Sequence, residues 1–344
     1  MAERVLTARE LNRALLARQL LLERARATLP RALERLGGLQ SQYAPSMYIG
    51  LWSRVEGFER RDLTRALERR SVVQGTLMRS TIHLVSGRDY WPFAVGIRRT
   101  RREWWLRAHP GQAAPDEMAA AAGRLKRRLV DGAVRGAEID ELLGKPHARG
   151  VGLWLDLVRV PPSGTWERRR ADLYAAAEDW LGPADATAGE GLEHLARCYL
   201  AAFGPATRRD VAEWAGLPVG EIASALERLR LRRFRAEGGE ELLDLPRAPL
   251  PDPETPAPVR FLPVWDATLL VHARRTGILP EEYRPLVFNT RTPHSVNTFL
   301  VDGAVAGTWR YERGRVQLEP FARLDRAALR ELREEAERLA AFHA

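Results

Sequence analysis

The sequence predicts a mostly helical α+β protein of three tandem winged helix-turn-helix units with an appended C-terminal β-rich part. Three observations predict this. The order helix, short helix, helix, hairpin is readable in residues 190–245, and it recurs twice, in looser form, earlier in the chain. A proline-dense stretch then precedes segments with strand patterning. We expect units at residues 1–108, 109–188 and 189–246, and a C-terminal part at 259–344.

The third unit shows the pattern most clearly. Apolar residues at helical spacing indicate a first helix: Leu192, Leu195, Tyr199 and Phe203. This helix is expected to end at Gly204-Pro205. Thr207 and Asp210 resemble a capping box for a short helix that Gly216 closes. A third helix follows, and "LRRFRAE" and "ELLDL" around Gly238-Gly239 predict a hairpin.

The two earlier units have the same order without a strict sequence period. In residues 30–86, three helical segments precede the extended stretch "VVQGTLMRSTIHLVS". In residues 116–178, a helix and "GAEIDELLG" precede "GVGLWLDLV" and a wing, "RVPPSGTWERRR". Residues 246–258 read as a semi-rigid linker because they are rich in proline. Beyond it, strands turning at Asp302-Gly303 and Arg313-Gly314 precede a helix from about Asp325.

Composition narrows the function classes. The chain has 344 residues, a formal net charge of +9 and a single cysteine, Cys198, which excludes an intramolecular disulfide and a multi-cysteine metal cluster. The positive charge favours a polyanionic partner, although arginine is abundant throughout. The sequence has no apolar signal region, membrane-length run, P-loop, dinucleotide fingerprint or G-x-S-x-G elbow. We therefore expect a cytoplasmic protein with no membrane association, cofactor or metal.

Two glutamines stand one residue apart in "GGLQSQYAP". After two glycines the chain is expected to be extended before "APSMYIGLW" turns helical. Residues i and i+2 share one face of an extended segment, so Gln40 and Gln42 would present their amides together. On a helix they would point about 200° apart. The alternative is a pair of solvent-facing amides in a connecting loop.

Residues 76–85 are expected to form one strand. By the two-residue period, Met78, Ile82 and Leu84 would face one way. Arg79, Thr81 and His83 would then form a row of hydrogen-bonding groups on the other face. That row could contact a ligand or simply face solvent.

Five stretches in this order resemble the AlkZ/AlkX-like winged-helix DNA glycosylases over about residues 5–322: "GGLQSQYAPSMYIGLWSR", "TLMRSTIHLVSGRDY", "AAFGPATRRDVAEWAGL", "FLPVWDATLLVHARR" and "NTFLVDGAVAGTW". The resemblance implies a monofunctional enzyme that excises N7-alkylated or bulky alkylated purines from double-stranded DNA and, in some members, unhooks interstrand crosslinks. The family's catalytic motif is a glutamine, a usually apolar spacer, and then a glutamine or an aspartate. By this resemblance Gln40 and Gln42 are the catalytic residues, and Ser41 is an unusual spacer. Residues expected at the DNA are Arg54, Arg79, Thr81, His83, Trp309 and Arg310. For Trp309 and Arg310 the alternative is a core tryptophan followed by a surface arginine.

The alternative function is a non-catalytic winged-helix DNA-binding protein or transcriptional regulator. A regulator would normally be a dimer that places recognition helices in successive major grooves. A glycosylase with all its units on one surface is expected to be a monomer.

Overall fold

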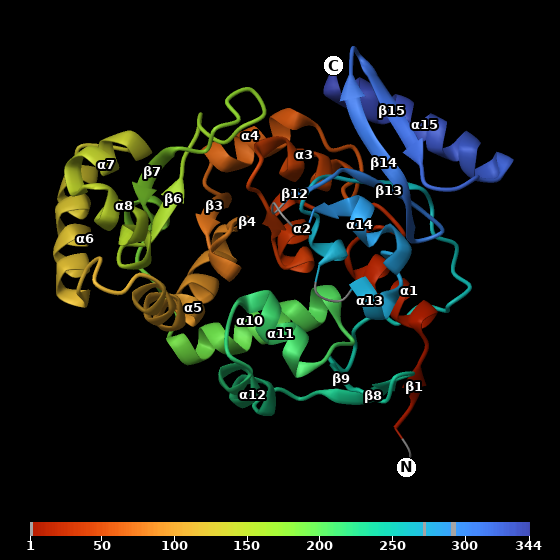
Figure 1. Ribbon diagram of the computed structural model, residues 1–344, viewed down its shortest axis with the longest axis horizontal. Coiled ribbons are helices and arrows are strands. Elements are labelled where there is room, and N and C mark those ends of the chain that lie inside the picture. Colours follow the sequence, from red (N-terminus) through yellow and green to blue (C-terminus); the bar gives the residue numbers. More distant parts are fainter. Residues whose placement is uncertain (1–2, 271–272, 290–293) are drawn as a thin grey trace.

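The computed structural model describes residues 3–270, 273–289 and 294–344 (Figure 1). Residues 271–272, inside one of the stretches that carry the family resemblance, lie outside the described part. The chain has the mixed α and β composition that the sequence predicts, with helices predominating. No helix in the described part is both long enough and apolar enough to cross a bilayer.

The first unit follows a short N-terminal strand and helix, β1 (Val5–Leu6) and α1 (Ala8–Arg18). Its elements are α2 (Leu29–Leu36), β2 (Leu39–Gln40), α3 (Ala44–Trp52), α4 (Arg60–Glu68), β3 (Val72–Thr76) and β4 (Ile82–Ser86). Strand β2 pairs with β4, and β4 pairs with β3, all antiparallel. The helices have the predicted order, and the extended stretch expected after them is a hairpin of β3 and β4.

The predicted single strand at residues 76–85 is wrong. The segment is a hairpin whose strands β3 and β4 are joined by a 3₁₀ turn, η1 (Met78–Ser80). Arg79 and Ser80 both have positive φ, 54° and 57°, in the left-handed region that few non-glycine residues adopt. The turn contains no glycine, proline or asparagine, and Ser80 is its only common turn residue, so its sequence carries a weak turn signal.

The long helix α5 (Gly87–Ala108) leads to the second unit. The elements of that unit are α6 (Pro115–Leu129), β5 (Val134–Arg135), α7 (Gly136–Leu143), α8 (Lys145–Gly150), the 3₁₀ turn η2 (Val151–Leu153), β6 (Leu157–Arg159) and β7 (Leu173–Ala176). A short helix, α9 (Ala177–Leu181), follows β7.

The first two units share one sheet. Its strand order is β2-β4-β3-β6-β7-β5, and β3 pairs with β6 through Gln74 opposite Arg159 and Gly75 opposite Val158. In Figure 1 the hairpins of the two units lie side by side between the left-hand helices and the centre of the molecule. The predicted boundary near residue 108 therefore does not separate two independent sheets.

The third unit has the order predicted from its sequence. Its elements are α10 (Ala188–Phe203), α11 (Arg208–Ala215), α12 (Val219–Glu227), β8 (Arg232–Ala236) and β9 (Glu241–Asp244), with β1 adding in parallel to β8. Thr207 and Asp210 form the predicted capping box. Gly216 ends α11 in the left-handed conformation, with a φ of 73°.

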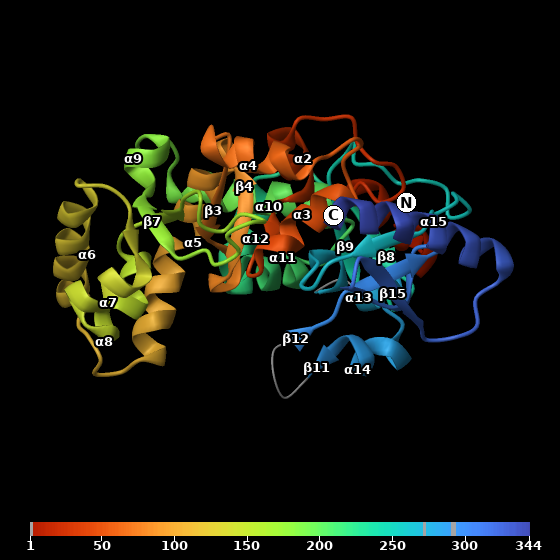
Figure 2. The same ribbon diagram turned by 90° about the horizontal axis from the view of Figure 1, so that it is seen from above.

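The C-terminal part is a four-stranded antiparallel sheet packed beside a helix. The sheet order is β10 (Arg260–Leu262), β13 (Thr298–Val301), β14 (Ala304–Glu312) and β15 (Arg315–Pro320), and the helix is α15 (Arg326–His343). The turns at Asp302-Gly303 and Arg313-Gly314 and the helix start at Asp325 are as predicted. Smaller elements lie between β10 and β13: η3 (Ala267–Leu269), α13 (Ala273–Thr276), η4 (Glu281–Tyr283), α14 (Arg284–Val287), β11 (Phe288–Asn289) and β12 (His294–Ser295). In Figure 2, α14, β11 and β12 project from one side of the molecule.

The proline-dense stretch 246–258 does not behave as a spacer. Arginines of α1 donate to its carbonyl oxygens: Arg9 to Pro253 at 2.9 Å, Arg13 to Thr255 at 2.7 Å, and Arg18 to Pro249 at 2.8 Å. The C-terminal sheet also shares a hydrophobic core with α2, α3 and α4 of the first unit. The linker is therefore fixed along α1, and the C-terminal part packs directly on the first unit.

Candidate active site

The Gln-Ser-Gln segment begins in the edge strand β2 of the first sheet and bends at Gln42. Gly37 and Gly38 have φ angles of 70° and 82° and turn the chain from α2 into β2. Gln40 lies opposite His83 in the β2–β4 pairing, and the Ser41 amide donates to the Ile82 carbonyl at 2.8 Å. The predicted extended conformation is confirmed for Gln40 in β2, whereas the chain bends at Gln42 and Tyr43 before the predicted helix α3 begins. That the two amides share one face stays a prediction.

Side-chain burial alternates along this segment. Ser41 is buried, with 1% of its surface exposed, whereas Gln40 is partly exposed and Gln42 is exposed. Ser41 therefore occupies the inward position, where the family's usual apolar spacer would pack. Its hydroxyl oxygen has no hydrogen-bond partner among the described residues. The two glutamines keep their amides out of the core.

Arg79 fixes the orientation of the Gln40 amide. Its Nη2 donates to Gln40 Oε1 at 3.2 Å, and its Nη1 donates to the Trp214 carbonyl at the end of α11. A guanidinium can only donate, so the oxygen of the Gln40 amide faces Arg79. A side-chain carbon added to Gly216 would come within 2.9 Å of the Arg79 amide nitrogen. Glycine at that helix end permits the third unit to approach the η1 turn closely.

His83 is buried beside these groups and is a neutral hydrogen-bonding residue. Burial, together with the positive charges of Arg79 and Arg101, lowers its pKa to about 3. His83 Nδ1 lies 3.1 Å from the Thr81 carbonyl oxygen, which can only accept, so Nδ1 carries the hydrogen and Nε2 a lone pair. Thr81 uses its own hydroxyl to donate to the Met78 carbonyl at 3.0 Å.

A cavity of about 730 Å³ opens between the first two units, and Gln42 lies in its wall. The other lining residues include Thr76, Tyr90, Arg101, Arg159 and Tyr174. Arg101 comes from α5 and Arg159 from β6, so the shared sheet and the long connecting helix both contribute to the cavity. These residues lie far apart in the chain, so no local sequence motif identifies them.

Five of the six predicted DNA contacts fall into two groups in the structure. Arg79 bonds the Gln40 amide, His83 lies opposite Gln40 in the sheet and Thr81 contacts His83, although the turn at Arg79 replaces the predicted row on one strand face. Arg54 and Trp309 are core residues: Arg54 is fully buried and pairs with Asp266 at 2.9 Å, and the indole nitrogen of Trp309 donates to the Leu262 carbonyl at 3.0 Å. As placed, neither side chain is available to DNA.

Arg310 stands apart from both groups. Its side chain is exposed on β14 and pairs with Glu319 at 2.9 Å, an ion pair that DNA could compete for. It belongs to the C-terminal sheet, so its contact with DNA stays a prediction separate from the Gln40 site.

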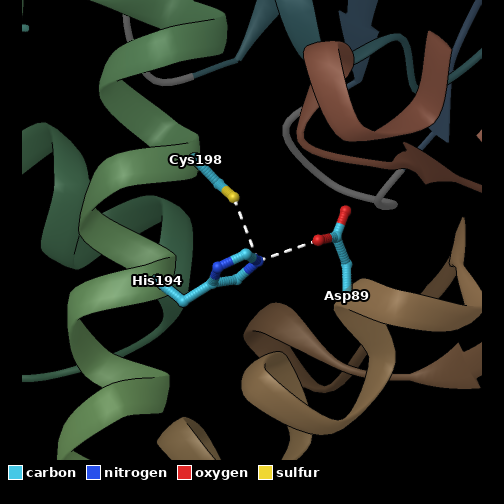
Figure 3. Close-up of side chains that lie close together, drawn as sticks. All are labelled: Asp89, His194 and Cys198. Carbon is cyan, nitrogen blue, oxygen red and sulfur yellow. Dashed lines mark hydrogen bonds and ion pairs between the residues drawn. The ribbon is translucent and has the colours of Figure 1, made fainter. Parts of the chain in front are cut away.

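Asp89, His194 and Cys198 form a second chemically notable cluster (Figure 3). His194 Nε2 lies 2.9 Å from Asp89 Oδ1 and 3.3 Å from Cys198 Sγ, so the three groups could hold a metal ion. Burial raises the pKa of the Cys198 thiol, which favours a protonated thiol in a hydrogen-bond chain. The sequence analysis missed this cluster, although His194 and Cys198 are four residues apart on one helix.

Comparison with known proteins identifies the family to which the chain belongs. Residues 33–342 match the family described as "DNA glycosylase AlkZ-like". The chain is a DNA glycosylase, an enzyme of DNA repair. It belongs to the AlkZ-like DNA glycosylase family, as the resemblance in its motifs implied.

The fold comparison agrees over the whole molecule. The solved structure of Streptomyces sahachiroi DNA glycosylase AlkZ superposes with a TM-score of 0.82 and 18% sequence identity. The match covers 99% of this chain and 98% of that one. No protein in a curated set matches the sequence. At 18% identity this similarity shows that the two proteins have the same fold.

Proposed function

We propose that this enzyme hydrolyses the N-glycosidic bond of N7-alkylated or bulky alkylated purines in double-stranded DNA, using Gln40 and Gln42 as its catalytic residues and no cofactor. The observation that carries the proposal is the Gln-Ser-Gln segment itself. Its spacer is buried, both amides remain outside the core, and Gln42 lines the cavity between the first two units.

The chemistry suits amides. An N7-alkylated purine carries a positive charge, so the electron pair of the breaking C1′–N9 bond neutralises the leaving base. Little general-acid help is then needed. The oxygen of water forms the new bond to C1′ and loses its proton to solvent. Glutamine is not a base near neutral pH, but its amide can hydrogen-bond the water and favour a cationic sugar through its dipole. The same step at an N7-linked interstrand crosslink would free one strand from the adduct.

Water is the proposed nucleophile because neither lysine fits that role. Glycosylases that also cut the backbone attack the sugar with an amine and form a Schiff base. Lys126 is exposed on α6 and pairs with Glu178 at 2.6 Å, and Lys145 is exposed at the start of α8. Arginine cannot replace them because its guanidinium stays protonated. The expected product is an intact strand with an abasic site.

Base release from a duplex with one N7-methylguanine tests the proposal. We expect Gln40→Ala or Gln42→Ala to lower the single-turnover rate by about 10-fold or more, with DNA affinity changed less than about 2-fold. Gln317→Ala is the matched control, because Gln317 is an exposed glutamine on β15. Equal losses of rate and affinity would assign the pair to DNA binding, and absence of base release by the wild type would reject the substrate class.

A further inference from the structure

Buried arginines in most of this protein face a carboxylate. Arg18 pairs with Asp244 at 2.7 Å and Arg54 with Asp266 at 2.9 Å, and Arg13 pairs with Asp302. Such pairing is expected, because an uncompensated charge away from water is costly. Arg260 is one exception outside the site: it donates to the carbonyls of Val259 and Leu22.

Two partly buried arginines in the wall of the cavity that Gln42 lines, Arg101 and Arg159, also lack a carboxylate partner. Arg101 Nη1 donates to the Thr76 carbonyl at 2.8 Å, and Arg159 Nη1 donates to the Thr76 hydroxyl at 3.0 Å. Arg159 Nε also donates to the Ala171 carbonyl at 3.2 Å. Within the described part of the chain neither forms an ion pair. The carboxylate that acts on Arg101, Asp156, is itself bound by Arg98 at 2.7 Å.

These two guanidiniums have more donors than acceptors. Each carries five N–H groups, and Arg101 Nε is buried without a partner among the described residues. Burial lowers the pKa of Arg101 to about 10 and also lowers the pKa of Arg159. Both groups stay charged near neutral pH, so the cavity wall presents two partly buried cations. Arg159 also lies 5.1 Å from the centre of the Tyr174 ring. An anion with several acceptor oxygens would satisfy both.

We propose that Arg101 and Arg159 bind a phosphodiester group of the DNA strand that carries the damaged base, inside the cavity beside Gln42. A phosphodiester is a permanent anion whose oxygens only accept, which suits guanidinium groups. It is also present beside every nucleotide of the substrate. This assignment rests on the proposed function, because the DNA must reach Gln42 for its backbone to reach the cavity.

The bound phosphate would also matter for the reaction. The transition state for glycosidic cleavage places positive charge on the sugar, which nearby free arginines would disfavour. A phosphodiester held by those arginines offsets their charge and brings negative charge close to the sugar. The two arginines therefore act as positioning residues for a substrate group.

Single methylphosphonate substitutions test the site, since each removes the charge of one phosphodiester. Affinity would be measured for a duplex carrying a stable abasic-site analogue, so excision is not required. We expect one methylphosphonate next to the abasic site to weaken DNA binding by the wild type about 10-fold. The same methylphosphonate should weaken DNA binding by Arg101→Gln or Arg159→Gln by less than about 2-fold. Arg101→Lys should keep part of the sensitivity. Arg330→Gln, at an exposed arginine of α15, is the control.

The proposal is overturned if Arg101→Gln and Arg159→Gln both remain as sensitive as the wild type to methylphosphonate at every position, or if the wild type is insensitive at every position. Thermal unfolding of each variant identifies loss of fold. If Arg101→Gln does not fold, Arg101→Lys supplies the comparison. Because the measurement is binding, it gives a result even if base release from N7-methylguanine fails. Phosphate recognition without base release would separate this inference from the proposed substrate.

Discussion

Arg54 and Arg79 were both expected at the DNA, and the structure gives them different surroundings. Arg54 is enclosed between α3 and the C-terminal part, where the Asp266 carboxylate neutralises its charge. Arg79 lies in a tight turn and donates to a carbonyl and to the Gln40 amide, both neutral. Burial lowers the pKa of Arg79 to about 10. Arg54 therefore stabilises the fold through an ion pair. Arg79 has no counter-charge, so we attribute its retention beside Gln40 to a role in the active site.

The largest effect is expected when the Arg54 pair is broken. Asp266→Asn would leave a buried guanidinium without a counter-charge and destabilise the protein by about 3 kcal/mol or more. Chemical denaturation measures this change. The excision rate per folded molecule should stay within about 2-fold of the wild type. A large rate loss at unchanged stability would mean that this pair, too, serves the active site.

Arg79→Met should show the opposite pattern. We expect the excision rate to fall by about 10-fold because the Gln40 amide loses its fixed orientation, while stability falls by no more than about 1 kcal/mol. The double variant Arg79→Met/Gln40→Ala should be no slower than Gln40→Ala alone, because Arg79 acts through Gln40. Additive losses in single-turnover kinetics would instead indicate a separate contact with DNA.

Acid stability gives a third comparison, through His83. Its folded-state pKa of about 3 is below the ordinary value of about 6.5, so protons bind the unfolded state preferentially. The contribution of neutral His83 is complete above pH 6.5 and is lost as the pH falls towards 3. The loss is at most about 1.4 kcal/mol per pH unit. His83→Phe should show a shallower decline in urea unfolding between pH 6.5 and 4, and equal slopes would contradict a buried neutral imidazole.

The smallest effect is expected at the lysines. Lys126→Ala and Lys145→Ala should leave the excision rate within about 2-fold and the product strand intact, because water is the proposed nucleophile. Denaturing gels with and without alkali, together with borohydride trapping, measure both results. A trapped adduct in the wild type that disappears in either variant would require an amine mechanism.

The sequence predicted best where the signal was local. The turns at Asp302-Gly303 and Arg313-Gly314 each contain a glycine, which is suited to positive φ, and Thr207 with Asp210 marks a helix start. Gly37-Gly38 likewise indicated the extended segment that carries Gln40 and Gln42. These features depend on a few adjacent residues, so they could be identified without the rest of the fold.

The features that the sequence did not predict depend on contacts between segments far apart in the chain. The left-handed turn at Arg79 and Ser80 has only a weak local signal, and the end of α11 at Gly216 packs against it. Arg54 has a carboxylate partner more than 200 residues away, which its neighbours in sequence could not reveal. For the same reason the cavity arginines, which come from α5 and β6, were not identified.

The shared sheet has a mechanical consequence. The pairing of β3 with β6 makes the first two units one hydrogen-bonded body, and α5 bridges them a second time. A rotation of one unit against the other would have to break backbone hydrogen bonds. Gln40 lies on one side of that junction and Arg159 on the other, so the spacing between them is set before any ligand arrives. A duplex that reaches both must adapt its own shape, and the ease with which damaged DNA bends or opens then becomes part of what the protein recognises.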